Sequence, residues 1–142
     1  MIQHFFSVVL SVCLFNPATV KDDCTQVAGI KIWKETMVFA KDDGFPYCEL
    51  LQQAVNKDQK SIRRLAFKTF DASAGLGHGT VIVALVHKIG EETFVKAIKK
   101  LSPQNKKDVL LNLQAGLAYT SIKKYHEKPV KDVFPELARL LH

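Results

Sequence analysis

The stretch DASAGLGHGTVIVALVHKIG, residues 71–90, determines how the rest of the chain is interpreted. It contains four glycines, two histidines and one aspartate, together with a run of branched apolar residues. Three structures are compatible with such a stretch: a phosphate-binding loop, a catalytic loop, or a helix packed closely against a neighbour. Each makes a different demand on the residues around the glycines.

A phosphate-binding loop requires glycines because the backbone must approach the phosphate with no Cβ in the way, and it lies between a strand and a helix. Gly75, Gly77 and Gly79 have the spacing G-x-G-x-G, without a third glycine at the dinucleotide-binding spacing. The preceding residues 63–70, RRLAFKTF, have the pattern of a helix rather than a strand. We therefore expect no nucleotide site here and no cofactor.

A catalytic site would use Asp71, His78 and His87, because general acid–base chemistry needs a carboxylate within hydrogen-bond reach of an imidazole. In a continuous helix Asp71 and His78 lie on the same side but ~10 Å apart along the axis. His78 and His87 lie on opposite sides, so they cannot be paired metal ligands. We expect no catalytic residue and no metal site, and a small hydrolase using Asp71 with His78 or His87 is the alternative.

Close helix packing is the interpretation we favour. Ala72, Gly75 and Gly79 place small side chains at near-helical spacing, and each glycine costs ~1 kcal/mol of helix propensity unless a close contact or a bend offsets it. The run VIVALV, residues 81–86, has no polar face, as expected of a central helix buried on most sides. The alternatives are a buried strand, given the β-branched residues, and a loop at 75–79. A histidine in this glycine-rich segment need not belong to the core, so replacing His78 is expected to have a mild effect.

The flanking segments carry helix signals, with short connections between them. Asp58 and Ser102 are candidate N-caps, Pro103 occupies a first helical position, and Gly90 occupies a C-cap position. We predict an all-α protein, a single small domain of five to six helices packed as antiparallel hairpins in an irregular bundle. Residues 27–40 fit both helical spacing and strand alternation, and the helix is favoured.

The N-terminal twenty residues contain no Lys, Arg, Asp or Glu. Phe5–Phe15 is apolar apart from two serines, and Pro17 and Ala18 follow. An apolar stretch of ~7–15 residues followed by a small residue is typical of a secretory signal peptide. We expect a signal peptide at 1–18, a helical domain at 19–142, no transmembrane helix in the mature chain, and a secreted or periplasmic location. A buried N-terminal helix or strand is the alternative.

The number and positions of the cysteines are consistent with the predicted export of the protein. Removal of residues 1–18 would take away Cys13 and leave Cys24 and Cys48, an even pair that predicts one disulfide in an oxidising compartment. Two unpaired thiols in a cytosolic protein are the alternative. No other cysteine or histidine cluster accompanies the pair, so the spacing does not predict a zinc site.

The formal net charge is +6, and lysine doublets gather in the second half of the chain. Lys99, Lys100, Lys106 and Lys107 are candidates for a basic binding face, although solvated helix faces are the favoured explanation. No nucleic-acid-binding motif is present, so we expect no nucleic-acid partner. Trp33 and Tyr47 flank the predicted disulfide, where they either cover it in the core or anchor an interface.

This plan, a signal peptide followed by a small disulfide-bearing helical domain, is similar to that of bacterial exported proteins that bind another protein, periplasmic immunity proteins among them. The similarity lies in the plan, and no motif carries it. We expect a protein without enzymatic activity that binds a protein partner, as an inhibitor or immunity-like module. The alternatives are the hydrolase described above and a carrier of a small apolar ligand.

Overall fold

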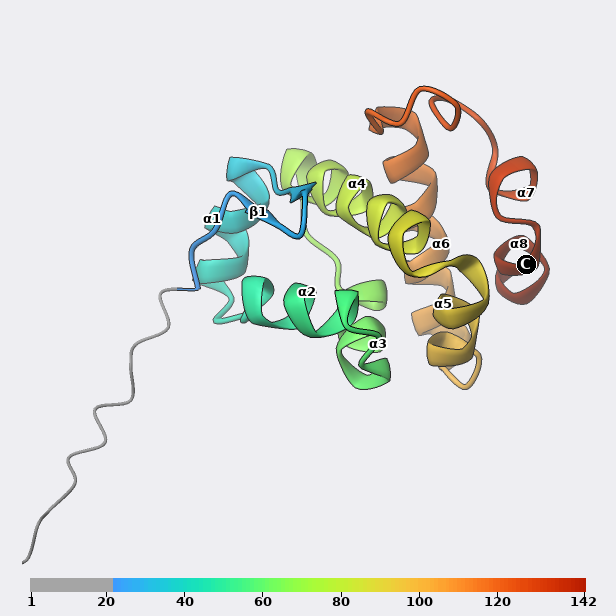
Figure 1. Ribbon diagram of the computed structural model, residues 1–142, viewed down its shortest axis with the longest axis horizontal. Helices are drawn as coiled ribbons and strands as arrows, with labels where there is room; N and C mark the ends of the chain where they lie inside the picture. The colour runs from blue at the N-terminus through green and yellow to red at the C-terminus, as the bar shows by residue number, and fades with distance from the viewer. Residues whose placement is uncertain (1–21) are drawn as a thin grey trace, which may run out of the picture.

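The computed structural model describes residues 22–142, which form a single all-α domain with a two-stranded hairpin near its N-terminal end (Figure 1). The predicted fold class is confirmed, and the eight helices slightly exceed the five to six expected. The expected signal peptide, residues 1–18, lies outside the described residues. The bounds of the elements are β1 (Gln26–Val27), β2 (Ile30–Lys31), α1 (Lys34–Asp42), α2 (Tyr47–Val55), α3 (Gln59–Phe67), α4 (Ala72–Ile89), α5 (Glu91–Ile98), α6 (Pro103–Tyr119), α7 (Val130–Val133) and α8 (Pro135–Leu141).

The ambiguous segment 27–40 contains both element types. β1 and β2 pair antiparallel through the two-residue turn Ala28-Gly29, and α1 begins only at Lys34. Both turn residues have positive φ, 49° and 82°, which gives the twist that two-residue hairpins require. The favoured helix is therefore wrong for residues 27–33 and right from Lys34 onward.

Local capping chemistry accounts for several of the helix ends. The carboxylate of Asp58 accepts a hydrogen bond from the Ser61 N–H at the start of α3, and the hydroxyl of Ser102 accepts one from the Asn105 N–H at the start of α6. At the end of α1, Gly44 has φ 64°, and the Phe45 N–H donates to the carbonyl of Ala40. The starts of α3 and α6 lie where the sequence signals predict them.

The stretch quoted above forms α4, a continuous helix in the centre of the domain (Figure 1). Ten of its eighteen residues are buried, and α1, α2, α5 and α6 all pack against it. Among the described residues, α4 also has the length and hydropathy of a membrane span. The packing of α4 against four other helices explains why its sequence is so apolar. This position in the core is consistent with the expectation that the mature chain has no transmembrane helix.

The glycines of α4 allow unusually close backbone contacts. A Cβ on Gly79 would lie 2.6 Å from the carbonyl oxygen of Asn112 and 2.7 Å from the backbone nitrogen of Gly116, both on α6. A Cβ on Gly77 would lie 2.8 Å from Cβ of Trp33, and one on Gly75 would overlap the carbonyl oxygen of Phe70. The packing interpretation is thus confirmed, and the strand and loop alternatives are wrong.

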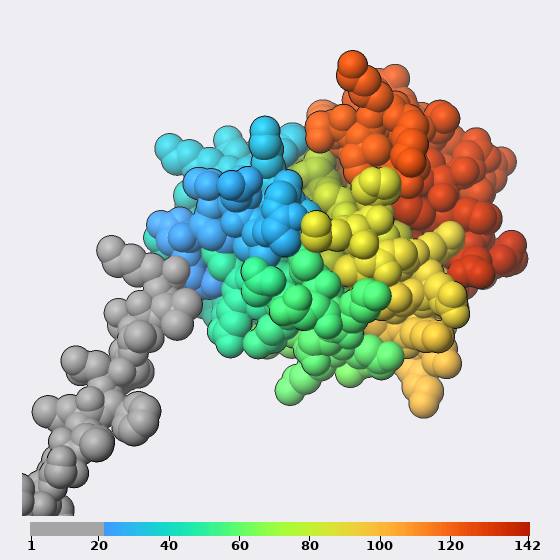
Figure 2. Space-filling model, in the orientation of Figure 1, coloured from blue at the N-terminus to red at the C-terminus, as the bar shows by residue number. Residues whose placement is uncertain are grey.

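A disulfide between Cys24 and Cys48 joins the segment preceding the hairpin to α2, as predicted. The same two regions are also joined by hydrogen bonds, because Oδ1 of Asp22 accepts from the backbone N–H groups of Cys48 and Glu49 at 3.0 and 3.2 Å. Figure 2 shows the resulting contact between the N-terminal segment, in blue, and the green residues of α2 and α3. The hairpin is therefore fixed against the helical body of the domain.

Candidate binding groove

His78 is fully buried, contrary to the expectation that it need not belong to the core. Its Nε2 lies 2.9 Å from the carbonyl oxygen of Leu65 and its Nδ1 lies 2.7 Å from the hydroxyl of Tyr47. Since a carbonyl can only accept, Nε2 carries the hydrogen, and the Tyr47 hydroxyl donates to Nδ1. Burial lowers the pKa of His78 to about 4 and raises the pKa of Tyr47. Both ring nitrogens are thus engaged in structural hydrogen bonds.

Aromatic rings surround this buried pair. The ring of Phe70 meets the imidazole of His78 edge to face at 5.2 Å, and Phe45 meets both Tyr47 and Phe70 in the same manner. The ammonium of Lys68 lies 4.9 Å and 5.3 Å from the ring centroids of Phe70 and Phe45. This aromatic cluster separates His78 from solvent and leaves no room beside it for a substrate.

The other two candidate catalytic residues lie in different surroundings. Asp71 is exposed at the N-cap position of α4, where its side chain makes no capping hydrogen bond. His87 is exposed two and a half turns beyond His78, and its Nδ1 lies 3.0 Å from the hydroxyl of Tyr125. The structure therefore does not bring Asp71, His78 and His87 together as a catalytic set.

The candidate basic residues lie where α5 ends and α6 begins. Lys99 and Lys100 are exposed and, together with Arg63 and Lys96, line a shallow depression of about 300 Å³. Lys107 is exposed in the first turns of α6, and its neighbour Lys106 is half-buried. The guanidinium of Arg63 donates to the carbonyl of Ala97, and Lys96 pairs with Glu92 at 3.4 Å, so part of this charge is already engaged.

The two aromatic candidates have different positions. Tyr47 is fully buried, so its side chain is part of the core and is not exposed to a partner. Trp33, at the N-cap of α1, is half-buried and meets Tyr119 edge to face at 6.2 Å. Tyr119, at the end of α6, is one of the exposed large hydrophobic residues of the described chain, at 52% exposure.

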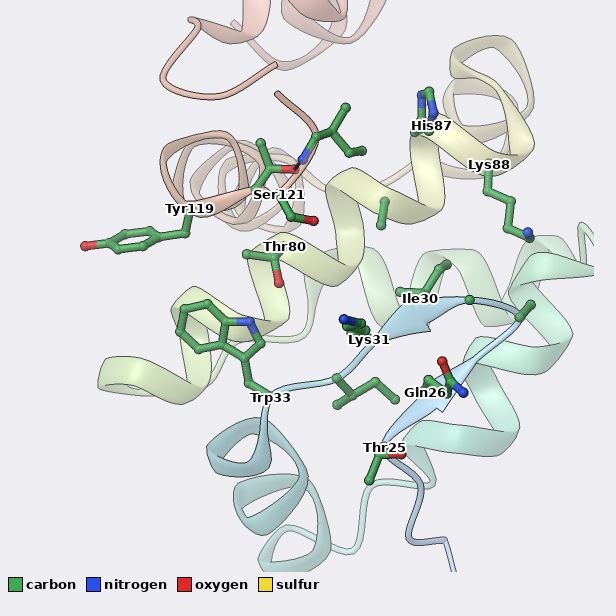
Figure 3. A pocket seen from close by; sticks show the side chains of 16 residues that line it. Thr25, Gln26, Ile30, Lys31, Trp33, Thr80, His87, Lys88, Tyr119 and Ser121 are labelled. Atoms are coloured by element: carbon green, nitrogen blue, oxygen red, sulfur yellow. Dashed lines mark hydrogen bonds between the residues drawn. The ribbon is translucent and has the colours of Figure 1, made fainter. Parts of the chain in front are cut away.

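Trp33 and Tyr119 stand at one end of a groove of about 1070 Å³, which we call the hairpin groove. It is formed by the β1–β2 hairpin, by one side of α4 and by the residues that follow α6 (Figure 3). Figure 3 shows Lys31 and Trp33 on the hairpin side of this space and Thr80 and Lys88 on the α4 side. Sequence reasoning missed the groove because its walls come from three distant segments, although it singled out two of the lining residues, Trp33 and His87, for other reasons.

The lining of the hairpin groove carries one sign of charge. Two of its sixteen residues are lysines, Lys31 and Lys88, and both are exposed. None of the sixteen is Asp or Glu. Hydroxyl groups of Thr80, Thr120 and Ser121 provide further polar atoms. The groove therefore combines positive charge, hydrogen-bonding groups and an exposed aromatic wall.

Comparison of the chain with protein-family models, with curated proteins and with solved structures found no match.

Proposed function

We propose that this chain is an exported protein without enzymatic activity that binds a protein partner through the hairpin groove, as an inhibitor or immunity-like module does. The observation that carries this proposal is the composition of the groove wall, where an exposed tyrosine, a tryptophan and two lysines occur without a carboxylate. Tryptophan and tyrosine are the residues most enriched at the energetic centres of protein interfaces.

The aromatic wall supports a protein partner in particular. Tyr119 presents about half of its surface to solvent next to Trp33, so a partner side chain can bury additional aromatic area there without any rearrangement of the core. The groove is partly open to solvent and carries lysines and hydroxyl groups in its lining, which suits a peptide segment better than a small apolar ligand enclosed on all sides. This favours a binding module over a lipid or ligand carrier.

The disulfide supports the extracytoplasmic part of the proposal. Disulfides persist in secreted and periplasmic proteins and are rare in the cytosol, where thiols are kept reduced. The Cys24–Cys48 bond joins the segment before the hairpin to α2, so an oxidising compartment would stabilise the same region that forms one wall of the groove.

The hydrolase alternative has less support. A general base must reach a substrate proton directly or through one water. The imidazole of His78 is fully buried with both nitrogens engaged, and Asp71 is exposed on the surface. His87 remains exposed, but its nearest ring partner is the hydroxyl of Tyr125 rather than a carboxylate.

The test is site-specific photocrosslinking in the native host. A benzoylphenylalanine is placed at Ser121, which lines the groove and is exposed, and in a second strain at Gln104, an exposed position at the start of α6 outside the groove. We expect one defined protein adduct from position 121 and none from position 104. Tyr119→Ala should abolish the adduct, and Leu111→Ala, which removes another exposed apolar side chain of α6, should leave it unchanged.

The proposal is overturned if no protein adduct forms at position 121. It is also overturned if positions 121 and 104 yield the same adducts, or if Tyr119→Ala and Leu111→Ala have equal effects.

A further inference from the structure

The Cys24–Cys48 disulfide lies where the hairpin wall of the groove is attached to the rest of the domain. We propose that this bond is a redox switch for the hairpin groove. Its reduction by a dithiol releases residues 22–32 from α2 and α4 and abolishes the groove, while α1–α8 stay folded. The consequence for partner binding rests on the function proposed above, because it assumes that the partner docks in the groove.

The groove depends on the hairpin segment for half of its lining. Eight of the sixteen lining residues lie between positions 25 and 33. The other eight come from α4, from the end of α6 and from the residues that follow it, and Figure 3 shows Thr80 and Lys88 of α4 across the space from the hairpin. Without the hairpin, these eight residues would form one open surface instead of a groove.

The hairpin has little stability of its own. Its strands β1 and β2 contain two residues each, and Ala28 in the turn has φ 49°, a left-handed conformation that is unfavourable for alanine. An isolated two-stranded hairpin is marginally stable at best in water. The conformation of this segment therefore depends on its attachment to α2 and α4.

The attachment combines a few noncovalent contacts with the disulfide. Val27, Ile30 and Ile32 are buried, with β1 packed on α2 and β2 on α4. These contacts must offset the conformational entropy lost when the whole segment is ordered. The disulfide lowers that entropic cost, because it keeps Cys24 next to Cys48 even when the segment is undocked. Reduction restores the full cost and leaves the noncovalent contacts to oppose it alone.

The hydrogen bonds of Asp22 lie next to the disulfide and depend on it in the same way. Oδ1 of Asp22 accepts from the N–H groups of Cys48 and Glu49 at the start of α2. Both N–H groups belong to the first turn of a helix, so water can replace the carboxylate when the segment is free. These two bonds therefore add little to the attachment once the covalent bond is broken.

The helical body is held by contacts that do not involve residues 22–32. The buried hydroxyl of Thr36 donates to the carbonyl of Ala74 at 2.8 Å, which anchors α1 on α4. The close crossing of α4 and α6 at Gly79 and Gly116 is likewise separate from the hairpin. The release should consequently stop where α1 begins.

The redox step is an ordinary thiol–disulfide exchange. A dithiol supplies two electrons and two protons, so the Cys24–Cys48 bond becomes two thiols while the dithiol closes to its own disulfide. Both cysteines are half-buried, so the bond is not enclosed in the core. Cytosolic thiols are kept reduced and extracytoplasmic ones are oxidised. The groove would then form only after export, and partner binding would be confined to the oxidising compartment.

Nuclear magnetic resonance of the purified, isotope-labelled protein tests the switch without any partner. Spectra are recorded of the oxidised protein and again after addition of dithiothreitol. We expect the backbone amide resonances of Gly29, Ile30 and Ile32 to move to random-coil positions on reduction. Those of Gly79 and Gly116, at the crossing of α4 and α6, should stay where they are in the oxidised protein.

Two variants separate the disulfide from other causes. The Cys24→Ser, Cys48→Ser double variant should show the released hairpin without reductant, and dithiothreitol should change nothing further. Asp22→Ala keeps the disulfide and removes only the two hydrogen bonds to α2, so its hairpin should stay docked in the oxidised protein. In the crosslinking experiment, the double cysteine variant should lose the adduct at position 121, and Asp22→Ala should keep it.

The inference is overturned if Ile30 and Ile32 keep their oxidised resonances after reduction, since the hairpin then stays docked without the bond. It is equally overturned if Gly79 and Gly116 shift together with the hairpin, because the disulfide would then stabilise the whole domain instead of the groove. Release of the hairpin in oxidised Asp22→Ala would also defeat it. If the parent forms no adduct at position 121, the proposed function fails, and the resonance experiment still decides whether the switch exists.

Discussion

The hydroxyl of Tyr47 lies 2.7 Å from Nδ1 of His78, and both side chains are fully buried although they come from helices that start 25 residues apart. This contact joins α2 to the central helix α4 and fixes the tautomer of the imidazole. It makes His78 a structural residue, and the first two predictions concern it.

Replacing His78 by Ala should destabilise the domain by about 3 kcal/mol. The substitution leaves the Tyr47 hydroxyl and the Leu65 carbonyl without their partner and opens a cavity in the aromatic cluster. His87→Ala, which removes an exposed imidazole from the same helix, should change the free energy of unfolding by less than about 0.5 kcal/mol. Urea denaturation of the two variants measures the difference, and similar values for both would refute the structural role of His78.

The stability of the domain should fall with acid in a defined pH window. The folded-state pKa of His78 is about 4, below its ordinary value of 6.5, so the unfolded chain takes up a proton before the folded one does. The stability that the neutral imidazole confers is fully present above pH 6.5 and is lost progressively as the pH falls to about 4. The total loss should be about 3 kcal/mol.

Denaturation curves at several pH values between 4 and 7 test this window. His78→Phe, which cannot take up a proton, should lose this part of the pH dependence. If the parent and His78→Phe have parallel profiles, another group causes the acid sensitivity.

Adding a side chain at Gly79 should destabilise the fold. The nearest atoms belong to the backbone of Asn112 and Gly116, which cannot move aside as a side chain can, so α4 and α6 must separate. We expect about 1–3 kcal/mol for Gly79→Val, with a smaller loss for Gly79→Ala. Ser73→Ala, at an exposed position of the same helix, should be nearly neutral. A Gly79→Val protein that melts at the temperature of the parent would contradict the close packing.

Removal of the disulfide should lower stability by about 2–4 kcal/mol. The Cys24→Ser, Cys48→Ser double variant tests this, because it frees the segment before the hairpin from α2. The difference in the denaturation midpoint between oxidised and reduced parent protein should match that of the variant. Labelling of both cysteines in the native protein without reductant would show that the bond is absent.

The hairpin turn offers a stabilising substitution. Ala28 has φ 49°, a left-handed conformation that costs an alanine roughly 1 kcal/mol, whereas asparagine adopts it readily in two-residue hairpin turns. We expect Ala28→Asn to raise the free energy of unfolding by about 0.5–1 kcal/mol and Ala28→Val to lower it. Thermal melts that rank the two variants in the opposite order would contradict the turn geometry.

Local signals made much of the fold predictable. The caps at Asp58 and Ser102, the proline at 103 and the glycine at 90 each act within a few residues, and each marks a helix end in the structure. The turn at Ala28-Gly29 was not recognised because alanine is unusual at a position that requires positive φ. A local signal is lost when the residue type does not match the conformation.

Long-range placement was less predictable from the sequence. The burial of His78 depends on Tyr47 and Leu65, 31 and 13 residues away, so periodicity within its own helix could not reveal it. The hairpin groove likewise combines residues near 30, 84 and 120. The sequence shows that Trp33 is an aromatic residue near the predicted disulfide. Its contact with Tyr119 could not be predicted, because that contact depends on how α1 and α6 pack against α4.

The crossing of α4 and α6 at Gly79 and Gly116 has a consequence for the binding that we propose at the groove. Thr80 follows Gly79 directly, and Tyr119 lies three residues beyond Gly116, so two walls of the groove are attached within one helical turn of the tightest backbone contact. Such close-packed interfaces resist deformation. The two walls should move as one rigid unit, and a partner then loses little affinity to ordering them. Under the proposed function, these walls are preorganised for binding, and adaptation then falls to the partner and to the long side chains of Lys31 and Lys88.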